Sequence, residues 1–213
     1  MARIINHPLG ELSGKVGAVV FKKTKYGSYL SSVPSGPPPK ASALQELQQS
    51  KMKAVMHFLT PLRVILKHTF FPLAQRTPTF NMIKSYYLRN AVTPSDVGYR
   101  IAYAKCLMSY GDLRIPEEVT ANWNPGQPVQ VSWNPQVTQA MAQADDVLFA
   151  VVYQPEVHQF YFVEHLANRE TAEAEFSLPE VWSAYPEFHL WTGYYRPEEQ
   201  QASLSVYLGV LGD

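Results

Sequence analysis

The sequence predicts an α+β protein: an N-terminal β-hairpin arm and helices, followed by an antiparallel β-sandwich of the immunoglobulin or fibronectin type. A proline run separates a glycine-rich start from a helical segment. The period of the apolar residues then changes from 3.6 to 2 after Gly98, and about seven short strand-like segments follow between turn signals. We therefore expect an arm and linker over residues 1–41, a helical region over 42–98 and the sandwich over 99–213.

The arm is predicted from glycines spaced among short apolar and aromatic runs. Residues 15–22 and 28–33 fit the two strands of a hairpin, because glycines at these spacings suit turns and bulges. Lys22, Lys23 and Lys25 then lie near the tip of this hairpin. A hairpin of this length is not stable by itself, so we expect it to pack on its own helices or on a neighbouring subunit.

A polyproline spacer and a helical segment follow the hairpin. The three consecutive prolines within residues 35–40 lack N–H donors and exclude both a helix and a central strand. Ser42, with a glutamine three residues later, fits a capping box, and apolar residues then recur at helical spacing. Pro61 interrupts this pattern, so we expect either a kinked helix or two helices over 43–59 and 61–73.

A further helix is predicted over residues 80–91, where Thr79 fits the N-cap and Pro94 prevents extension. Residues 99–108 show strand-like alternation, and the later segments are separated by Asn-Pro, Gln-Pro, Leu-Pro and Arg-Pro turn signals. The later predicted strands cover residues 113–122, 129–133, 147–153, 158–164, 172–177, 188–195 and 202–210.

Charge is distributed unequally along the chain, although the net charge is zero. Residues 1–110 contain 15 Lys or Arg and three Asp or Glu, a net charge of +12, and residues 111–213 contain the reverse, a net charge of −12. The molecule is bipolar if the two halves fold as separate bodies. The basic half could neutralise the phosphates of a nucleic acid, or it could meet the acidic half of another copy at near contact, since the Debye length is about 8 Å.

The sequence contains no recognisable catalytic, metal or cofactor constellation. Cys106 is the one cysteine and stands in an apolar context, so we expect a core thiol and neither a disulfide nor a Cys-rich zinc site. The histidines lack the spacing of a helical zinc site, and residues 10–15 lack the spacing of a phosphate loop. We therefore expect no enzyme, no metal and no cofactor.

No stretch of the sequence suits a secretory signal or a transmembrane helix. We therefore expect cytoplasmic synthesis without membrane insertion. Such synthesis is also compatible with assembly into a virion or an extracellular particle.

Aromatic residues in the second half suggest a surface patch for sugars or proteins. Trp182, Trp191, Tyr194 and Tyr195 are the candidates, because flat rings supply contact area at low entropic cost. Strand alternation within residues 188–195 instead places half of these rings in the sandwich core. The sequence leaves both interpretations open.

Four segments carry a resemblance to a known family: residues 8–17, with Ser-Gly-Lys-Val-Gly at their end, 31–34, 58–62 and 81–92. The chain resembles an uncharacterised protein family common in Bacteroidota over nearly its whole length, including a Gly-Asp-Leu element at 111–113. It departs from the family pattern at Glu11 and Leu12, where relatives tend toward small or aromatic residues. The resemblance implies a helical middle and a β-rich C-terminal region, and it attaches no enzyme class.

These observations favour a structural subunit that assembles with itself into a filament, tube, shell or phage-like particle. The basic arm is expected to contact the acidic sandwich of a neighbouring copy, head to tail. A nucleic-acid-associated protein and an adhesion or glycan-binding module are the alternatives. The residues predicted at the subunit interface are Ser13, Gly14, Lys15, Val16, Gly17, Phe21, Lys22, Lys23, Lys25, Tyr26 and Tyr29.

Overall fold

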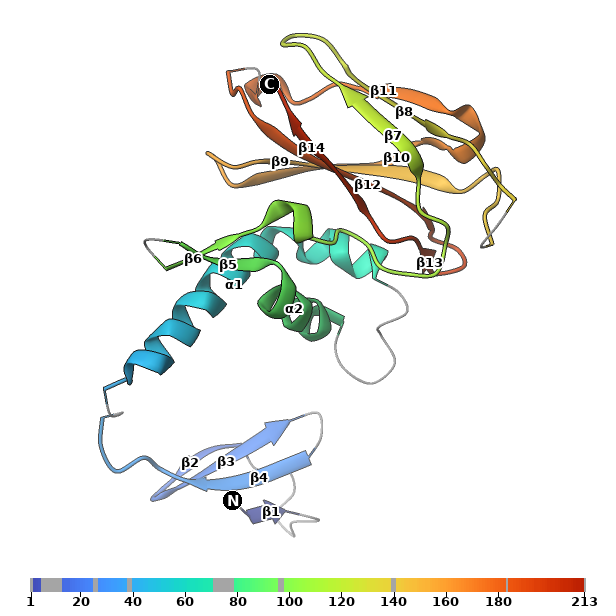
Figure 1. Cartoon of the computed structure of the whole chain (residues 1–213). Helices are drawn as coiled ribbons and strands as arrows, with labels where there is room; N and C mark the ends of the chain where they lie inside the picture. Colours follow the sequence, from blue (N-terminus) through green and yellow to red (C-terminus); the bar gives the residue numbers. More distant parts are fainter. Residues whose placement is uncertain are drawn as a thin grey trace. The chain divides into compact units, whose positions relative to one another are not determined.

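The chain divides into two compact units, the arm unit (Met1–Ser42) and the main unit (Ala43–Asp213) (Figure 1). The division falls next to the predicted end of the arm and linker. The computed structural model describes residues 2–4, 13–24, 27–37, 40–70, 79–95, 98–138, 141–182 and 184–212.

Four antiparallel strands form the arm unit. They are β1 (Ala2–Ile4), β2 (Gly14–Val16), β3 (Val19–Thr24) and β4 (Gly27–Ser32), in the order β1-β4-β3-β2. The predicted two-stranded hairpin is wrong in its first strand, because a turn at Gly17 and Ala18 divides residues 15–22 between β2 and β3. Gly17 has a φ of 59°, which glycine adopts without strain. Lys25, predicted near the hairpin tip, and Tyr26, predicted at the subunit interface, lie outside the described residues.

The main unit begins with α1 (Ala43–Thr69), a single helix that contains Pro61, so the alternative of two helices is wrong. An interior proline costs about 3 kcal/mol, because it removes a backbone hydrogen bond and crowds the preceding turn. Phe58, Leu59 and Leu62 are buried beside it. Each such side chain contributes about 1.5–3 kcal/mol on burial, so packing outweighs the cost of the proline.

The second helix, α2 (Thr79–Asn90), confirms the prediction over residues 80–91. A short hairpin of β5 (Val92–Ser95) and β6 (Gly98–Ile101) follows. The strand predicted over 99–108 therefore ends early. A 3-10 turn replaces its second part, where the N–H of Cys106 donates to the carbonyl oxygen of Tyr103 at 3.0 Å.

Two antiparallel sheets make up the rest of the main unit (Figure 1). One has the order β11-β8-β7. The other has the order β10-β9-β12, and β13 and β14 both pair with β12. The bounds are β7 (Glu117–Asn122), β8 (Val129–Asn134), β9 (Val147–Gln154), β10 (Gln159–Asn168), β11 (Glu173–Phe176), β12 (Phe188–Arg196), β13 (Gln201–Ala202) and β14 (Val206–Leu211). These strands confirm the predicted β-rich C-terminal region.

The five-stranded sheet is covered on both faces. Val131 and Trp133 of the three-stranded sheet share one core with Leu190 of β12. Trp191, the next residue of β12, lies instead in a second core with Leu62 of α1. The main unit thus consists of a helical layer, a central sheet and an outer sheet. The predicted division at residue 98 does not separate two compact bodies, because the helices and the sandwich share this second core.

Gly111 allows the chain to pass against the backbone of Ala202. A Cβ at Gly111 would lie 2.1 Å from the Ala202 carbonyl oxygen, which also accepts the N–H of Leu113 at 3.0 Å. We expect Gly111→Ala to lower the free energy of unfolding by about 1–3 kcal/mol, since the backbone must shift. Urea denaturation measures this loss. Gly36→Ala is the control, because its added Cβ would meet nothing within 4 Å, and equal losses in both variants would contradict the explanation.

Candidate interaction surfaces

The arm sheet has an apolar face. Val16 pairs with Val19 and Phe21 pairs with Leu30, and residues paired across antiparallel strands point to the same side. Val16 is 65% exposed, and none of the residues 13–24, 27–37 and 40–42 is buried. A sheet with one apolar face normally covers it with a second layer. The described part of the arm unit does not supply that layer.

The opposite face of the arm sheet is basic. Lys15 is paired with Val20, and Lys22 follows two residues later, so both lysines lie on this face. Lys22 is paired with Tyr29, and its Nζ lies 5.9 Å from the centre of the tyrosine ring. Lys23 lies on the other face, at the end of β3. The remaining predicted interface residues, Ser13, Gly14 and Gly17, are exposed.

The outer face of the three-stranded sheet is acidic. Glu173 is paired with Ser132 and Glu175 with Gln130, and all four residues are exposed. These residues line a shallow depression of about 490 Å³ whose described lining contains no basic side chain. β11, which carries both glutamates, is an edge strand.

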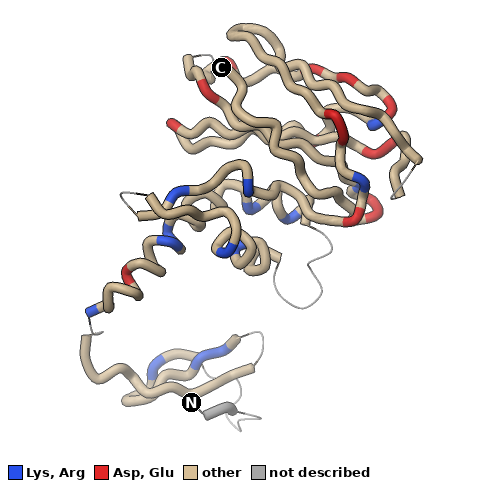
Figure 2. The backbone as a smooth tube through the Cα atoms, in the orientation of Figure 1, with Lys and Arg blue, Asp and Glu red and all other residues tan. Residues whose placement is uncertain are grey.

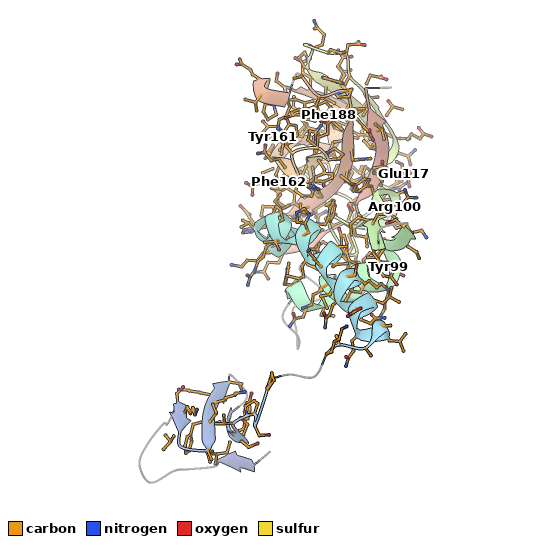
Figure 3. All side chains as sticks on the ribbon, turned by 90° about the vertical axis from the view of Figure 1, so that its left-hand side faces the viewer. Tyr99, Arg100, Glu117, Tyr161, Phe162 and Phe188 are labelled. Atoms are coloured by element: carbon orange, nitrogen blue, oxygen red, sulfur yellow. The ribbon has the colours of Figure 1, made fainter. Side chains whose placement is uncertain are left out.

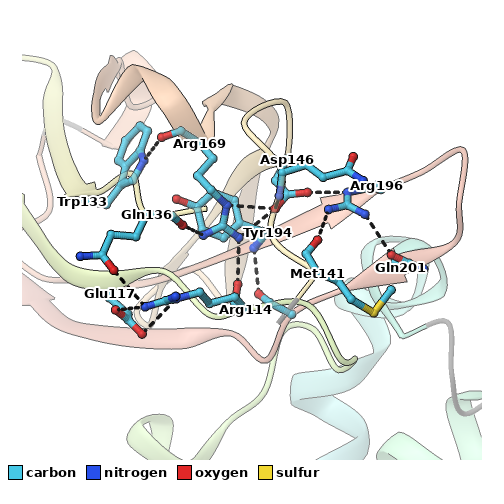
Figure 4. A network of polar contacts seen from close by, with 12 residues as sticks. Arg114, Glu117, Trp133, Gln136, Met141, Asp146, Arg169, Tyr194, Arg196 and Gln201 are labelled. Atoms are coloured by element: carbon cyan, nitrogen blue, oxygen red, sulfur yellow. Dashed lines mark hydrogen bonds and ion pairs between the residues drawn. The ribbon is translucent and has the colours of Figure 1, made fainter. Parts of the chain in front are cut away.

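A buried ion network explains why this acidic surface is not neutralised from within (Figure 4). Arg169 and Arg196 both pair with Asp146, whose side chain is fully buried. Arg114 pairs with Glu117 at 2.8 Å. These three arginines are the only Lys or Arg residues of positions 111–213. Because each of them already pairs with another carboxylate, they do not neutralise the glutamates of the outer face.

Charge is therefore split across the main unit itself. The helical layer, residues 43–110, contains nine Lys or Arg and two Asp or Glu, a net charge of +7, against −12 for residues 111–213. Figure 2 shows the basic positions along α1, α2 and their neighbours and the acidic positions over the two sheets. The bipolarity does not depend on separate halves, as the sequence suggested, because it belongs to one compact unit.

The predicted aromatic surface patch is wrong. Trp182, Trp191, Tyr194 and Tyr195 are all buried, with at most 3% of each side chain exposed. Alternation within one strand predicted that half of them would face out. The helical layer, however, covers the face of β12 that points away from the three-stranded sheet. The rings on both faces of β12 are therefore enclosed.

Sequence reasoning missed a groove between α1 and β6. It has a volume of about 480 Å³, and its lining comes from segments that are distant in the sequence. No local motif connects these segments, which explains why the sequence did not indicate the groove. The lining residues are Ser50, Lys53, Ala54, His57, Phe58, Tyr99, Arg100, Ile101, Tyr103, Tyr153 and His158.

Two further observations bear on chemistry. Cys106 is buried, which confirms the predicted core position, and burial raises the pKa of its thiol above the ordinary value. Among the described residues, no group of three His, Cys, Asp or Glu side chains is arranged to hold a metal ion. Within the same residues, no helix has both the length and the apolar character needed to cross a membrane.

Comparison with known proteins identifies a family. Residues 11–209 match the model of a family described as "Family of unknown function (DUF6266)". No curated protein matches the chain. The match agrees with the predicted resemblance to an uncharacterised family, and the Bacteroidota origin stays a prediction.

Proposed function

Because the chain belongs to the DUF6266 family, whose function is unknown, we propose its function from its own surfaces: it is a structural subunit that assembles head to tail with copies of itself. The observation that carries the proposal is the opposite charge of the arm unit and of the sheets: residues 1–42 contain six Lys or Arg and one Asp or Glu, whereas residues 111–213 have a net charge of −12. A contact between unlike surfaces repeats from copy to copy. It therefore closes into a ring or continues as a filament, tube or shell.

Strand addition is the proposed contact. Among the described strands, β2 is at the edge of the arm sheet and β11 is at the edge of the outer sheet, and an edge strand can pair with a further strand. Pairing β2 of one copy with β11 of the next would place Lys15 on the same face as Glu173 and Glu175. Charges paired across strands in this way stabilise a sheet and select its register.

The second faces of the two sheets also match. The apolar face of the arm sheet, with Val19 and Phe21, would continue the inner face of the outer sheet. On that inner face Phe176 already belongs to the sandwich core. One pairing thus aligns the apolar face of the arm sheet with the apolar inner face of the outer sheet, and it brings cations to the acidic face.

A charge exchange tests this contact. We expect either of two double variants to reduce the assembled mass to that of a monomer: Lys15→Glu with Lys22→Glu, or Glu173→Lys with Glu175→Lys. Each double variant places like charges on both sides of the contact, and like charges repel. Light scattering across a salt series measures the mass. Combining all four changes should restore assembly, since the attraction is regained with its direction reversed.

The matched control is Glu156→Lys with Glu198→Lys, which reverses two exposed acids outside the outer face. This control should leave the mass of the assembly unchanged. A wild-type protein that stays monomeric at every salt concentration, or a quadruple variant that stays as dissociated as either pair, would contradict the proposal.

We also infer that the sandwich is an immunoglobulin- or fibronectin-type domain. Seven strands in chain order divide into β7-β8-β11 and β10-β9-β12-β14. The immunoglobulin constant-type layout has the same order, except that its fourth strand joins the other sheet. Comparison with an experimental structure of this chain tests the inference.

Nucleic-acid binding is the second candidate function. The basic helical layer favours it, since Lys51 lies 5.8 Å from the ring of Tyr99 and further cations are exposed beside it. A nucleic-acid-binding protein would show an affinity for DNA or RNA whose logarithm falls linearly with the logarithm of the salt concentration. The glycan-binding alternative is not proposed, because the four rings that motivated it are buried.

A further inference from the structure

The groove between α1 and β6 has cationic walls. Lys53 is an exposed residue of α1, and Arg100 is an exposed residue of β6, the strand that packs against this helix. Figure 3 shows Tyr99 and Arg100 on the strand beside α1. None of the described lining residues is acidic, so none of them offsets the two positive charges. The groove therefore favours an anion.

Six of the other lining residues carry flat rings. The rings of His57 and His158 lie 4.5 Å apart, edge to face, and both residues are exposed. Phe58, Tyr103 and Tyr153 lie below them, with ring centres 5.2–5.9 Å apart. Such rings offer both faces and edges to a planar partner.

Contacts within and beside the groove hold these rings in place. Tyr153 stacks on Phe160 at 4.4 Å, and its hydroxyl forms a 2.8 Å hydrogen bond with Nδ1 of His158. Burial raises the pKa of Tyr153 and of Tyr103, so both hydroxyls stay protonated at neutral pH and add no negative charge to the groove. A site whose rings are already fixed loses little entropy when it binds.

We propose that this groove binds a small ligand that carries an anionic group on a planar ring. Lys53 and Arg100 contact the anion, and the exposed rings of His57 and His158 contact the planar part. A phosphate or a carboxylate could supply the charge, so the probes include both. The proposal is independent of head-to-tail assembly, because the groove shares no residue with the arm sheet or with the outer face.

Calorimetric titration of the full chain tests the proposal. Adenosine 5′-monophosphate and benzoate are the two anionic ring probes. Two compounds are controls: adenosine lacks the negative charge, and ribose 5-phosphate lacks the planar base. We expect at least one anionic ring probe to bind, and we expect adenosine and ribose 5-phosphate to bind about tenfold more weakly, since each keeps only half of the contacts. Binding of benzoate without the nucleotide would identify a carboxylate as the anion.

The decisive variant is Lys53→Ala with Arg100→Ala, which should weaken binding about tenfold, because both charges lie at the groove. Lys67→Ala with Arg89→Ala removes the same two charge types from exposed helical positions outside it and should leave the affinity unchanged. Equal weakening in both variants would overturn the proposal. The proposal would also be overturned if neither anionic ring probe showed saturable binding up to about 10 mM. The same holds if adenosine or ribose 5-phosphate bound as tightly as the better anionic ring probe.

Discussion

Asp146→Ala is expected to lower the free energy of unfolding by about 3–5 kcal/mol, the largest loss of any single substitution considered. Asp146 accepts hydrogen bonds from Arg169 at 2.9 Å, from Arg196 and from the backbone N–H of Gln143 at 3.0 Å. Arg169 is 1% exposed and Arg196 is 8% exposed. Removing the carboxylate leaves two buried guanidinium groups without their main counter-charge.

The remaining contacts of Arg169 do not replace the carboxylate. Its guanidinium lies 3.7 Å from the ring centre of Tyr194 and donates to the carbonyl oxygen of Arg114 at 3.0 Å. These contacts orient the charge without neutralising it. Packing around the network also depends on Arg169, because its carbonyl oxygen accepts the indole N–H of Trp133 at 2.8 Å.

Urea denaturation of Asp146→Ala beside Glu117→Ala separates a buried pair from an exposed one. Glu117 pairs with Arg114, but its side chain is 42% exposed, so its loss should cost less than about 1 kcal/mol. A loss below about 1 kcal/mol for Asp146→Ala as well would show that solvent reaches the arginines.

The sequence predicted three strands of the sandwich well, because their ends are marked locally, whereas the strand predicted over 202–210 is divided into β13 and β14. β8, β9 and β12 agree with the predicted segments to within one residue at each end. Turns with proline follow each of these strands, and proline prevents both helix and central strand wherever it stands. Such signals need no knowledge of distant contacts.

Features that depend on distant contacts could not be predicted. Asp146 lies 23 residues from Arg169 and 50 from Arg196, and acids elsewhere in the sequence look the same. The burial of Trp191 depends on a helix that begins at Ala43. A period of 2 shows that a strand has two faces, but it does not show whether a second layer covers the outer one.

His189 makes the stability of the main unit depend on pH. Its side chain is 6% exposed, its ring centre lies 4.0 Å from that of Tyr103, and its Nδ1 is 2.7 Å from the hydroxyl of Tyr207. Burial lowers the pKa of His189 to about 4. Glu187, 3.6 Å from Nε2, would raise the pKa, but its side chain is 55% exposed and water screens it.

The folded state therefore resists protonation of His189. In the unfolded chain the imidazole takes up a proton below a pKa of about 6.5, whereas in the folded state it does so only below about 4. Stability is fully present above the unfolded pKa and falls as the pH drops through this window. The difference amounts to about 3 kcal/mol.

Urea unfolding of wild type and His189→Gln at pH 7 and pH 4 measures this contribution. Glutamine stays uncharged and can still form a hydrogen bond, so the variant should lose about 3 kcal/mol less than wild type on acidification, even if it is less stable at pH 7. Carboxylates that titrate over the same range act equally in both proteins and cancel in the comparison. Equal losses would mean that His189 gains its proton within the folded state, and water would then have to reach the ring between Tyr103 and Tyr207.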